Sequence, residues 1–502
     1  MSAVAPASPA LTSSAPVVSI GTRAAQGAVW TIIFSGLNKV VALASQIALA
    51  WFLLPKEMGL FATAMSVASV ASIFSGGNLR SVVIQEEQKN PVILSQVFWL
   101  ALVLNAMAAI LVAVFGTVAG GLFREPQLAP VIFLLALVLP FMALPTVYSA
   151  LLYRDLRFRT IARIQFMEGL IRNGGAAVLA ACGFGAYSLI LPMLGSAIFA
   201  WVSCRFAAGK LTLTPPRPRT WPALLGPAGW LIAVSLFAAL QTYGASFVIG
   251  LKQNSTVTGF YYWGCSLSSQ ATFVLAVNLQ NIFFPALSKW NYDLSLQREK
   301  FIQICRVLLL SLVPVTVLQI VLAKPAIEFL FHERWLPAIP VVQWLSFGML
   351  TQPIAVAANA LLLARGKFKI LAITASAMAA AMIAAAVAGA SLGDQSQIAR
   401  WTGTSLFLMN IVVGWVAFRQ LDQQSNSYFC AAVLPVAAAV PLGTAAWACA
   451  NLIKQWPAPV CIAATAVVVM AAYVLAVKLC VPALIPELMA KLKLRSLLAG
   501  NA

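Results

Sequence analysis

Two cations lie deep inside apolar stretches of this sequence, where a charged side chain has little water to solvate it. Lys39 stands about twelve residues into the stretch 27–53, roughly 18 Å along a helix that rises about 1.5 Å per residue. Arg172 stands about nine residues into the stretch 163–184. A charge at the centre of a membrane helix costs about 2.5–3.5 kcal/mol, so such residues usually serve a function. The functional interpretation is anion binding, and the structural one is a cation held by carbonyls of its own bundle.

The acidic residue Glu168 lies one helical turn before Arg172, at the i, i+4 spacing that lets two side chains pair. Two interpretations stay open. In the first, the pair neutralises itself locally and has no further role. In the second, protonation of Glu168 releases Arg172, which would couple transport to a proton gradient. Either way the interior keeps an excess of positive charge, which favours an anionic ligand.

Uncharged polar residues recur within other apolar stretches. Amides in such positions bind sugar hydroxyls, but they also join helices to one another at about 0.6–2 kcal/mol each. For any one residue the second role is the more common, while the set as a whole is expected to line a cavity. The set is Gln46, Gln241, Gln270, Asn278, Gln352 and Asn359.

The residues that hold metals or cofactors do not cluster in this sequence. Its eight cysteines are scattered without a CxxC pair, and its only histidine, His332, has no cysteine neighbour. These spacings do not support zinc ligation, haem attachment or a disulfide framework. There is also no recognisable phosphate loop or catalytic triad, so we expect no metal, no cofactor and no catalytic residue.

The composition indicates whether the chain folds in water or in a lipid bilayer. Hydrophobic residues make up 61% of the 502 residues and charged residues only 9%, and the mean hydropathy is +0.91. Soluble domains have about 45–50% apolar and about 25% charged residues. The apolar runs reach about 20 residues, the length that crosses a bilayer. The chain is therefore expected to be an all-α integral membrane protein.

Polar breaks divide the sequence into about fourteen apolar stretches long enough to span a membrane. They are 27–53, 58–78, 94–118, 128–152, 163–184, 186–206, 222–250, 257–283, 303–323, 337–363, 370–391, 399–418, 428–451 and 459–481. Residues 1–22 carry no basic signal-peptide region, so we expect a disordered cytoplasmic tail there, and a second cytoplasmic tail at 482–502.

The net charge of +19 does not indicate a nucleic-acid partner, because the cations gather in alternate short loops. Examples are Arg154–Arg163, Arg205–Arg219 and Arg365–Lys369. Such loops face the cytoplasm in membrane proteins. The pattern places both termini in the cytoplasm, and membrane lipids around the chain.

The sequence repeats itself after roughly 200 residues, with matches at corresponding points of the expected topology. Met58–Phe61 resembles Thr258–Tyr261, Leu122–Glu125 resembles Leu330–Glu333, and Arg157–Arg159 resembles Lys367–Lys369. We therefore expect two pseudo-symmetric six-helix bundles, as in alternating-access transporters. The expected division is an N-terminal bundle at 23–206, a cytoplasmic linker at 207–221, a C-terminal bundle at 222–420 and two further helices within 428–481.

Several short motifs between residues 20 and 420 resemble those of the Wzx-type polysaccharide and O-antigen repeat-unit flippases. They are Arg23–Trp30, Leu53–Phe61, Ile84–Gln85, Tyr153–Phe158, Gly183–Leu189, Phe284–Ser288 and Glu333–Ala338. This family belongs to the multidrug/oligosaccharidyl-lipid/polysaccharide exporter superfamily. The resemblance implies a flippase of the bacterial inner membrane that moves undecaprenyl-pyrophosphate-linked oligosaccharide to the periplasmic leaflet for exopolysaccharide, capsule or lipopolysaccharide synthesis. It also implies Lys39 and Arg172 as pyrophosphate ligands, and a polysaccharide polymerase and a chain-length regulator as partners.

Two other functions remain as alternatives. A multidrug cation antiporter of the same superfamily needs buried acids, whereas the charge within these spans is mostly positive. A membrane-embedded polymerase or glycosyltransferase needs catalytic groups or long loops, whereas every loop here is short.

Overall fold

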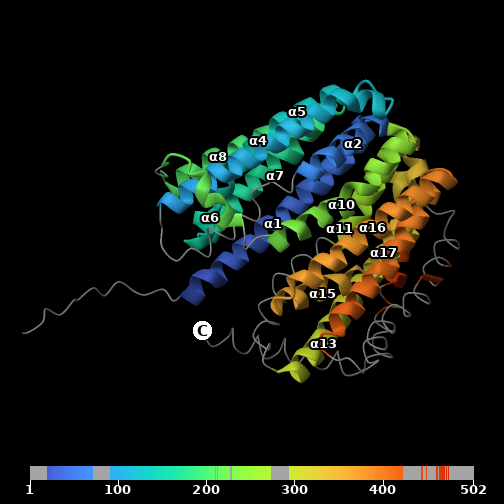
Figure 1. Cartoon of the computed structure of the whole chain (residues 1–502). Helices are drawn as coiled ribbons and strands as arrows, with labels where there is room; N and C mark the ends of the chain where they lie inside the picture. Colours follow the sequence, from blue (N-terminus) through green and yellow to red (C-terminus); the bar gives the residue numbers. More distant parts are fainter. Residues whose placement is uncertain are drawn as a thin grey trace, which may run out of the picture.

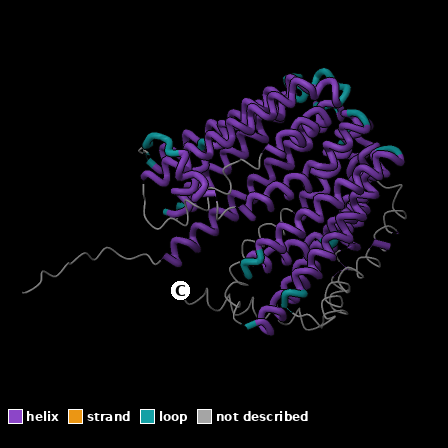
Figure 2. The backbone as a smooth tube through the Cα atoms, viewed as in Figure 1, coloured by secondary structure: helices purple, strands orange, loops and turns teal. Residues whose placement is uncertain are grey.

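The computed structural model describes residues 20–71, 91–155, 157–209, 213–225, 229–272 and 293–421, Leu211, and a few residues between 443 and 473. Within these ranges every regular element is a helix (Figure 2). The N-terminal half contains α1 Ile20–Phe52, α2 Pro55–Ala71, α4 Pro91–Leu122, α5 Leu128–Ala143, α6 Pro145–Arg154, α7 Phe158–Ala181 and α8 Tyr187–Ala208. Then come η2 Pro218–Thr220 and α9 Trp221–Leu225. The C-terminal half contains α10 Gly229–Lys252, α11 Ser255–Thr272, α13 Leu294–Leu330, η5 Glu333–Ala338, α14 Ile339–Met349, α15 Gln352–Ala364, α16 Phe368–Leu392 and α17 Gln395–Phe418.

The sequence marks many of these helix starts with residues that suit a first turn. Proline opens α2, α4 and α6, where its missing N–H costs nothing. Asp293 caps α13 by accepting a hydrogen bond from the Leu296 N–H at 3.0 Å, and Asp394 caps α17 through the Ser396 N–H at 3.2 Å. Acidic N-caps of this kind satisfy amides that have no partner within the helix.

The described helices confirm a multi-pass membrane protein. Eight of them are long and apolar enough to cross a bilayer, or nine if the bent pair Glu333–Met349 and Gln352–Ala364 forms one span. Other helices, such as α2 and α7, overlap expected spans but are shorter or more polar. Most of expected span 428–451 and about half of expected span 459–481 lie outside the described residues, so the total of fourteen remains a prediction. The expected tail 482–502 lies outside them too, and α1 already begins at Ile20, within the expected tail 1–22.

The two halves repeat one another in three dimensions. Helix α4 ends at Leu122 and α13 at Leu330, while α7 begins at Phe158 and α16 at Phe368. The residues that precede α7 and α16 share one backbone conformation, with φ −84° and ψ 49° at Arg157 and φ −82° and ψ 52° at Lys367. The sequence matches therefore mark equivalent structural points, which confirms two pseudo-symmetric bundles.

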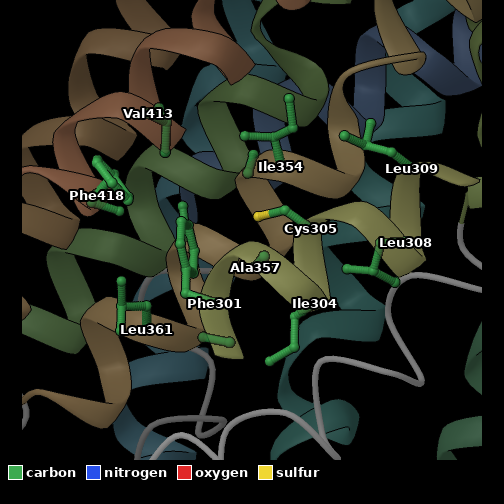
Figure 3. Packing of buried hydrophobic residues seen from close by; sticks show 14 of the residues in the cluster. Phe301, Ile304, Cys305, Leu308, Leu309, Ile354, Ala357, Leu361, Val413 and Phe418 are labelled. Atoms are coloured by element: carbon green, nitrogen blue, oxygen red, sulfur yellow. The ribbon is translucent and has the colours of Figure 1, made fainter. Parts of the chain in front are cut away.

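Equivalent helices also pack in the same way within each half. Helix α1 packs along α7 as α10 packs along α16, and α7 packs along α8 as α16 packs along α17. The core of the C-terminal half contains Phe301, Cys305, Leu361 and Phe418, all fully or almost fully buried (Figure 3). A separate buried cluster in the N-terminal half contains Leu60, Ile132 and Ile190, so each half has a hydrophobic core that can hold it together as a unit.

Two glycines that are equivalent in the repeat bring the halves into contact. A Cβ atom on Gly59 of α2 would lie 1.6 Å from the Ser255 carbonyl oxygen, and one on Gly259 of α11 would lie 1.8 Å from the Pro55 carbonyl oxygen. Only glycine allows two helix backbones to approach so closely. This crossing lies beside the α1–α2 and α10–α11 turns, and the two groups of helices spread apart toward the opposite end (Figure 1). We call the end with the glycine crossing the closed end.

The stretch between the halves is fastened to α4 of the N-terminal half. Gln96 Nε2 donates to the Pro215 carbonyl at 2.9 Å, while Gln96 Oε1 accepts from the Arg217 N–H at 2.6 Å. Trp99 Nε1 donates to the Thr214 carbonyl at 3.0 Å. Residues 214–217 are therefore held against the N-terminal half by side chains of one helix.

We predict that Gly259→Ala lowers the midpoint of thermal unfolding in detergent. The added methyl overlaps the Pro55 carbonyl, and overpacking of this kind costs about 1–3 kcal/mol. Gly121→Ala in α4 is the matched control, since nothing lies within 4 Å of its Cβ position. Equal midpoints for the two variants would contradict the close crossing.

Candidate functional site

Lys39 and Arg172 come from neighbouring helices, α1 and α7, which pack along each other in the N-terminal half. Lys39 is half-buried and Arg172 is exposed, although both belong to helices at the positions of expected spans. The two positive charges are close enough to repel each other electrostatically. The structure thus brings together the two cations that the sequence placed 133 positions apart.

A polar cavity of about 230 Å³ lies between α1 and α7. It contains Arg172 and Glu168 from the expected site, together with polar groups of both helices. Lys39 is adjacent in sequence to a lining residue but is not itself in the lining. The described residues that line it are Phe34, Ser35, Asn38, Ala162, Gln165, Phe166, Glu168, Gly169 and Arg172.

A notch in α7 explains how α1 can approach it here. A Cβ atom on Gly169 would lie 2.0 Å from Asn38 Oδ1, so only glycine leaves room for the asparagine. Asn38 Nδ2 donates to the Gln165 carbonyl at 3.5 Å, and Ser45 Oγ donates to the Asn173 carbonyl at 2.6 Å farther along. These contacts fix the register of the two helices, and with it the position of Lys39 relative to Arg172.

The cavity offers both charge and hydrogen-bonding groups to a ligand. Asn38 Oδ1 is buried against Gly169 and accepts no hydrogen bond from the described protein atoms, which leaves it an unsatisfied acceptor beside the cavity. The volume suits a phosphate group with water and is below the about 300–1,000 Å³ of sites that enclose drug-sized ligands. The site can therefore hold an anionic headgroup but not an oligosaccharide.

The charge of Arg172 also reaches the C-terminal half. It acts electrostatically on the hydroxyls of Tyr243 in α10 and Tyr262 in α11. Tyr262 packs edge-on against Phe61 of α2, with ring centroids 5.8 Å apart. Arg172 itself lines the α1–α7 cavity within the N-terminal half.

The other polar residues of the expected site divide into two groups. Gln46 of α1 donates to Ser266 Oγ at 3.1 Å and accepts from Gln270 Nε2 at 3.0 Å, both in α11, so these amides join the halves. Gln241 in α10 and Gln352 and Asn359 in α15 are half-buried and do not line the α1–α7 cavity. Asn278 lies outside the described residues.

A second, apolar cavity of about 240 Å³ lies between α1 and α13. Leu43, Gln46 and Ile47 line it on one side, and Leu322, Ala326 and neighbouring residues of α13 line it on the other. It begins about one helical turn beyond Lys39 along α1, so a single helix borders a polar and an apolar space.

Sequence reasoning identified the charges of this site but missed Asn38, Gln165 and Gly169. Asn38 and Gln165 are polar residues within apolar spans, which is a usable signal in itself. Their partnership crosses 127 sequence positions and depends on the missing side chain at Gly169. A single sequence does not reveal such a contact.

Comparison with known sequences identifies the family. The profile of the family described as "Polysaccharide biosynthesis protein" matches residues 48–340, which is more than half of the chain. This chain belongs to that family. The match includes the last five residues of α1, all of α7 and the crossing of α2 with α11, while Lys39 lies before it.

Curated relatives are about a fifth to a quarter identical to this family member over the aligned residues. The lipopolysaccharide biosynthesis protein WzxC of Escherichia coli strain K12 is 22% identical, covering 70% of this chain and 72% of its own. The teichuronic acid biosynthesis protein TuaB of Bacillus subtilis strain 168 is 20% identical, covering 73% and 76%. The succinoglycan biosynthesis transport protein ExoT of Rhizobium meliloti strain 1021 is 24% identical, covering 60% and 62%.

Solved structures show that the fold is shared with known membrane transporters. The lipid II flippase MurJ in an inward closed conformation superposes with a TM-score of 0.71 at 13% identity, covering 90% of this chain and 98% of that one. An inward-facing multidrug transporter of the MATE family superposes with a TM-score of 0.61 at 14% identity, covering 77% and 96%. These likenesses confirm the two-bundle transporter fold.

We predict that a cysteine at Ser35, in a cysteine-free background, reacts faster with an anionic thiosulfonate than with a cationic one of similar size. The positive field of Lys39 and Arg172 should produce a preference of roughly tenfold. The same cysteine combined with Arg172→Gln is the control and should lose most of this preference. A preference that is absent, or that survives the control, would contradict a cationic cavity.

Proposed function

We propose that this protein is a flippase for a lipid-linked anionic saccharide. Its substrate would be undecaprenyl-pyrophosphate-linked oligosaccharide, moved from the cytoplasmic to the periplasmic leaflet of the bacterial inner membrane. The product would supply exopolysaccharide, capsule or lipopolysaccharide synthesis, together with a polysaccharide polymerase and a chain-length regulator.

One observation carries this proposal: two like charges lie near each other on adjacent membrane helices. The like charges of Lys39 and Arg172 act on each other electrostatically, and the acid Glu168 lines the same cavity as Arg172. An anion between or beside the two cations relieves their repulsion and gains charge-assisted hydrogen bonds. A pyrophosphate, with two adjacent anionic groups, fits a site that presents two separate cations.

The family and the names of its members support the same substrate class. Two relatives are named for the biosynthesis of lipopolysaccharide and of teichuronic acid, and a third is named as a transport protein of succinoglycan biosynthesis. The transporter fold provides two bundles that can rock about a central space. Because the α1–α7 cavity holds only a headgroup, the saccharide would occupy the space between the halves.

The orientation of the chain follows from its loops. Cations concentrate in the loops on the side where α1 begins, so this side, with both termini, would face the cytoplasm. The closed end would then face the periplasm. In this state the cationic cavity would be reached from the cytoplasmic side, where a lipid-linked precursor is assembled.

A multidrug cation antiporter has the same fold, but the charges described here disfavour it. A cation antiporter needs buried acidic side chains that bind either a proton or the transported cation. Glu168 is the one acid among the described residues that line the α1–α7 cavity, and it lies one helical turn from Arg172. The site is thus suited to an anion.

We predict that Lys39→Ala reduces export of the polymer at least tenfold at an unchanged protein level. It removes one charge-assisted contact of about 1.5–3 kcal/mol to the pyrophosphate. Lys39→Arg keeps the charge and should retain part of the export. Lys252→Ala is the control, because that lysine donates to Ser391 Oγ at 2.7 Å, near the closed end. Normal export by Lys39→Ala would refute pyrophosphate binding at this position.

We predict that Glu168→Gln leaves substrate binding intact and makes transport insensitive to the proton gradient. Protonation of Glu168 would free Arg172 for the headgroup, and the neutral amide would mimic that state permanently. The measurement is transport into vesicles with and without an imposed pH gradient. A variant that still responds to collapse of the gradient as the wild type does would leave Glu168 a static partner of Arg172.

A further inference from the structure

The C-terminal end of α1 is capped by side chains of the other half. The last four carbonyl groups of a helix have no partner within it. Here the Ala50 carbonyl accepts hydrogen bonds from Trp335 Nε1 at 2.7 Å and from Arg334 Nη2 at 3.4 Å. The Trp51 carbonyl accepts from Arg334 Nη2 as well. Arg334 and Trp335 belong to η5, so the termination of an N-terminal helix depends on the C-terminal half.

The capping is reciprocal. Helix α13 ends at Leu330, and the Leu330 carbonyl accepts a hydrogen bond from Trp51 Nε1 at 2.6 Å. Each half therefore supplies a tryptophan N–H to the last turn of a helix in the other half. The Arg334 guanidinium adds a positive charge at the negative end of the α1 dipole.

Aromatic packing positions these donors. Trp335 is fully buried, with its ring centroid 4.5 Å from that of Trp263 and 6.1 Å from that of Phe260. Ala50, Leu53 and Met58 of the N-terminal half belong to the same buried cluster. The indole of Trp335 is thus held in place by α11 and directed at α1.

Opening of the closed end has to break these contacts. Helix α1 would move away from η5 and α13, which leaves the Ala50, Trp51 and Leu330 carbonyls to water. Exchange of one such hydrogen bond for water shifts an equilibrium by roughly three- to tenfold. Arg334 Nε, which is buried without a partner among the described atoms, becomes hydrated on opening and partly offsets this change. The closed state is therefore favoured but reversible.

We infer that Trp51, Arg334 and Trp335 form the latch of the periplasmic gate, a reciprocal capping of α1 and α13 that must open to release the substrate. This inference rests on the proposed flippase function and on its orientation in the membrane. The latch lies about 16 Å beyond Lys39 along α1, as eleven residues at about 1.5 Å each indicate. One helix thus carries both the proposed headgroup site and the latch. A substrate that shifts α1 would therefore also change the hydrogen bonds of the latch.

The test measures access from the periplasm, without any substrate. A single cysteine replaces Ser266, which lies between the halves against Gln46, in a chain whose eight native cysteines are replaced. A membrane-impermeant maleimide is added to spheroplasts, and the labelling rate is compared among Trp51→Phe, Arg334→Gln and Trp335→Phe. Each variant removes a latch donor and keeps the size of its side chain approximately.

We expect each latch variant to raise the labelling rate roughly three- to tenfold, in line with the loss of one hydrogen bond. Trp99→Phe is the matched control, since its indole donates to the Thr214 carbonyl and not to the other half. Its labelling rate should equal that of the parent. Trp51 is 51% exposed, so Trp51→Phe tests the latch even if Trp335→Phe fails to fold.

Unchanged labelling of both Trp51→Phe and Arg334→Gln would overturn the latch. An increase that Trp99→Phe shares would do the same, because it would reflect general loosening. This outcome is separate from that of the proposed function, which Lys39→Ala tests through export. Faster labelling of the latch variants together with normal export by Lys39→Ala would retain the latch and refute the headgroup site.

Discussion

Backbone groups in a membrane have no water to bond with, and this constraint governs how the two halves of the protein meet. Every helix that ends near the hydrocarbon leaves carbonyl groups without a partner inside the helix. In α1 and α13 these carbonyls find their donors across the boundary between the halves, at Trp335, Arg334 and Trp51. The contact between the two halves is therefore also part of how a helix ends in each of them.

Side chains also satisfy carbonyl groups at or near helix ends within each half. Arg157 caps the end of α8 by donating to the Ala207 carbonyl, and Arg365 donates to the Gln420 carbonyl just after α17. The two arginines occupy equivalent positions in the repeat, since Arg157 lies in the loop between α6 and α7 and Arg365 in the loop between α15 and α16. A cation at a helix C-terminus complements the dipole and satisfies a carbonyl at once. These two cationic loops thus also satisfy carbonyls at or just beyond the ends of helices.

The sequence predicted the helices, the repeat and the two cations, because each depends on local composition or on similarity along the chain. Apolar runs gave the spans to within several residues, and Phe158 and Phe368 marked equivalent helix starts. It did not predict that Gln46 binds Ser266 and Gln270, or that Gly169 admits Asn38. Those contacts depend on helix rotation and register, which hydropathy does not specify. The lining of a substrate cavity by the other amides stays a prediction.

The glycine crossing has a consequence for the origin of the fold. Gly59 meets the backbone around Gly259, and Gly259 meets that around Gly59, so each residue contacts its own counterpart. This is the pattern of an isologous interface on a two-fold axis. A homodimer of one six-helix unit would make the same contact twice with identical chains. An even number of spans lets two such copies join in tandem without inversion, which fits descent from a duplicated and fused gene.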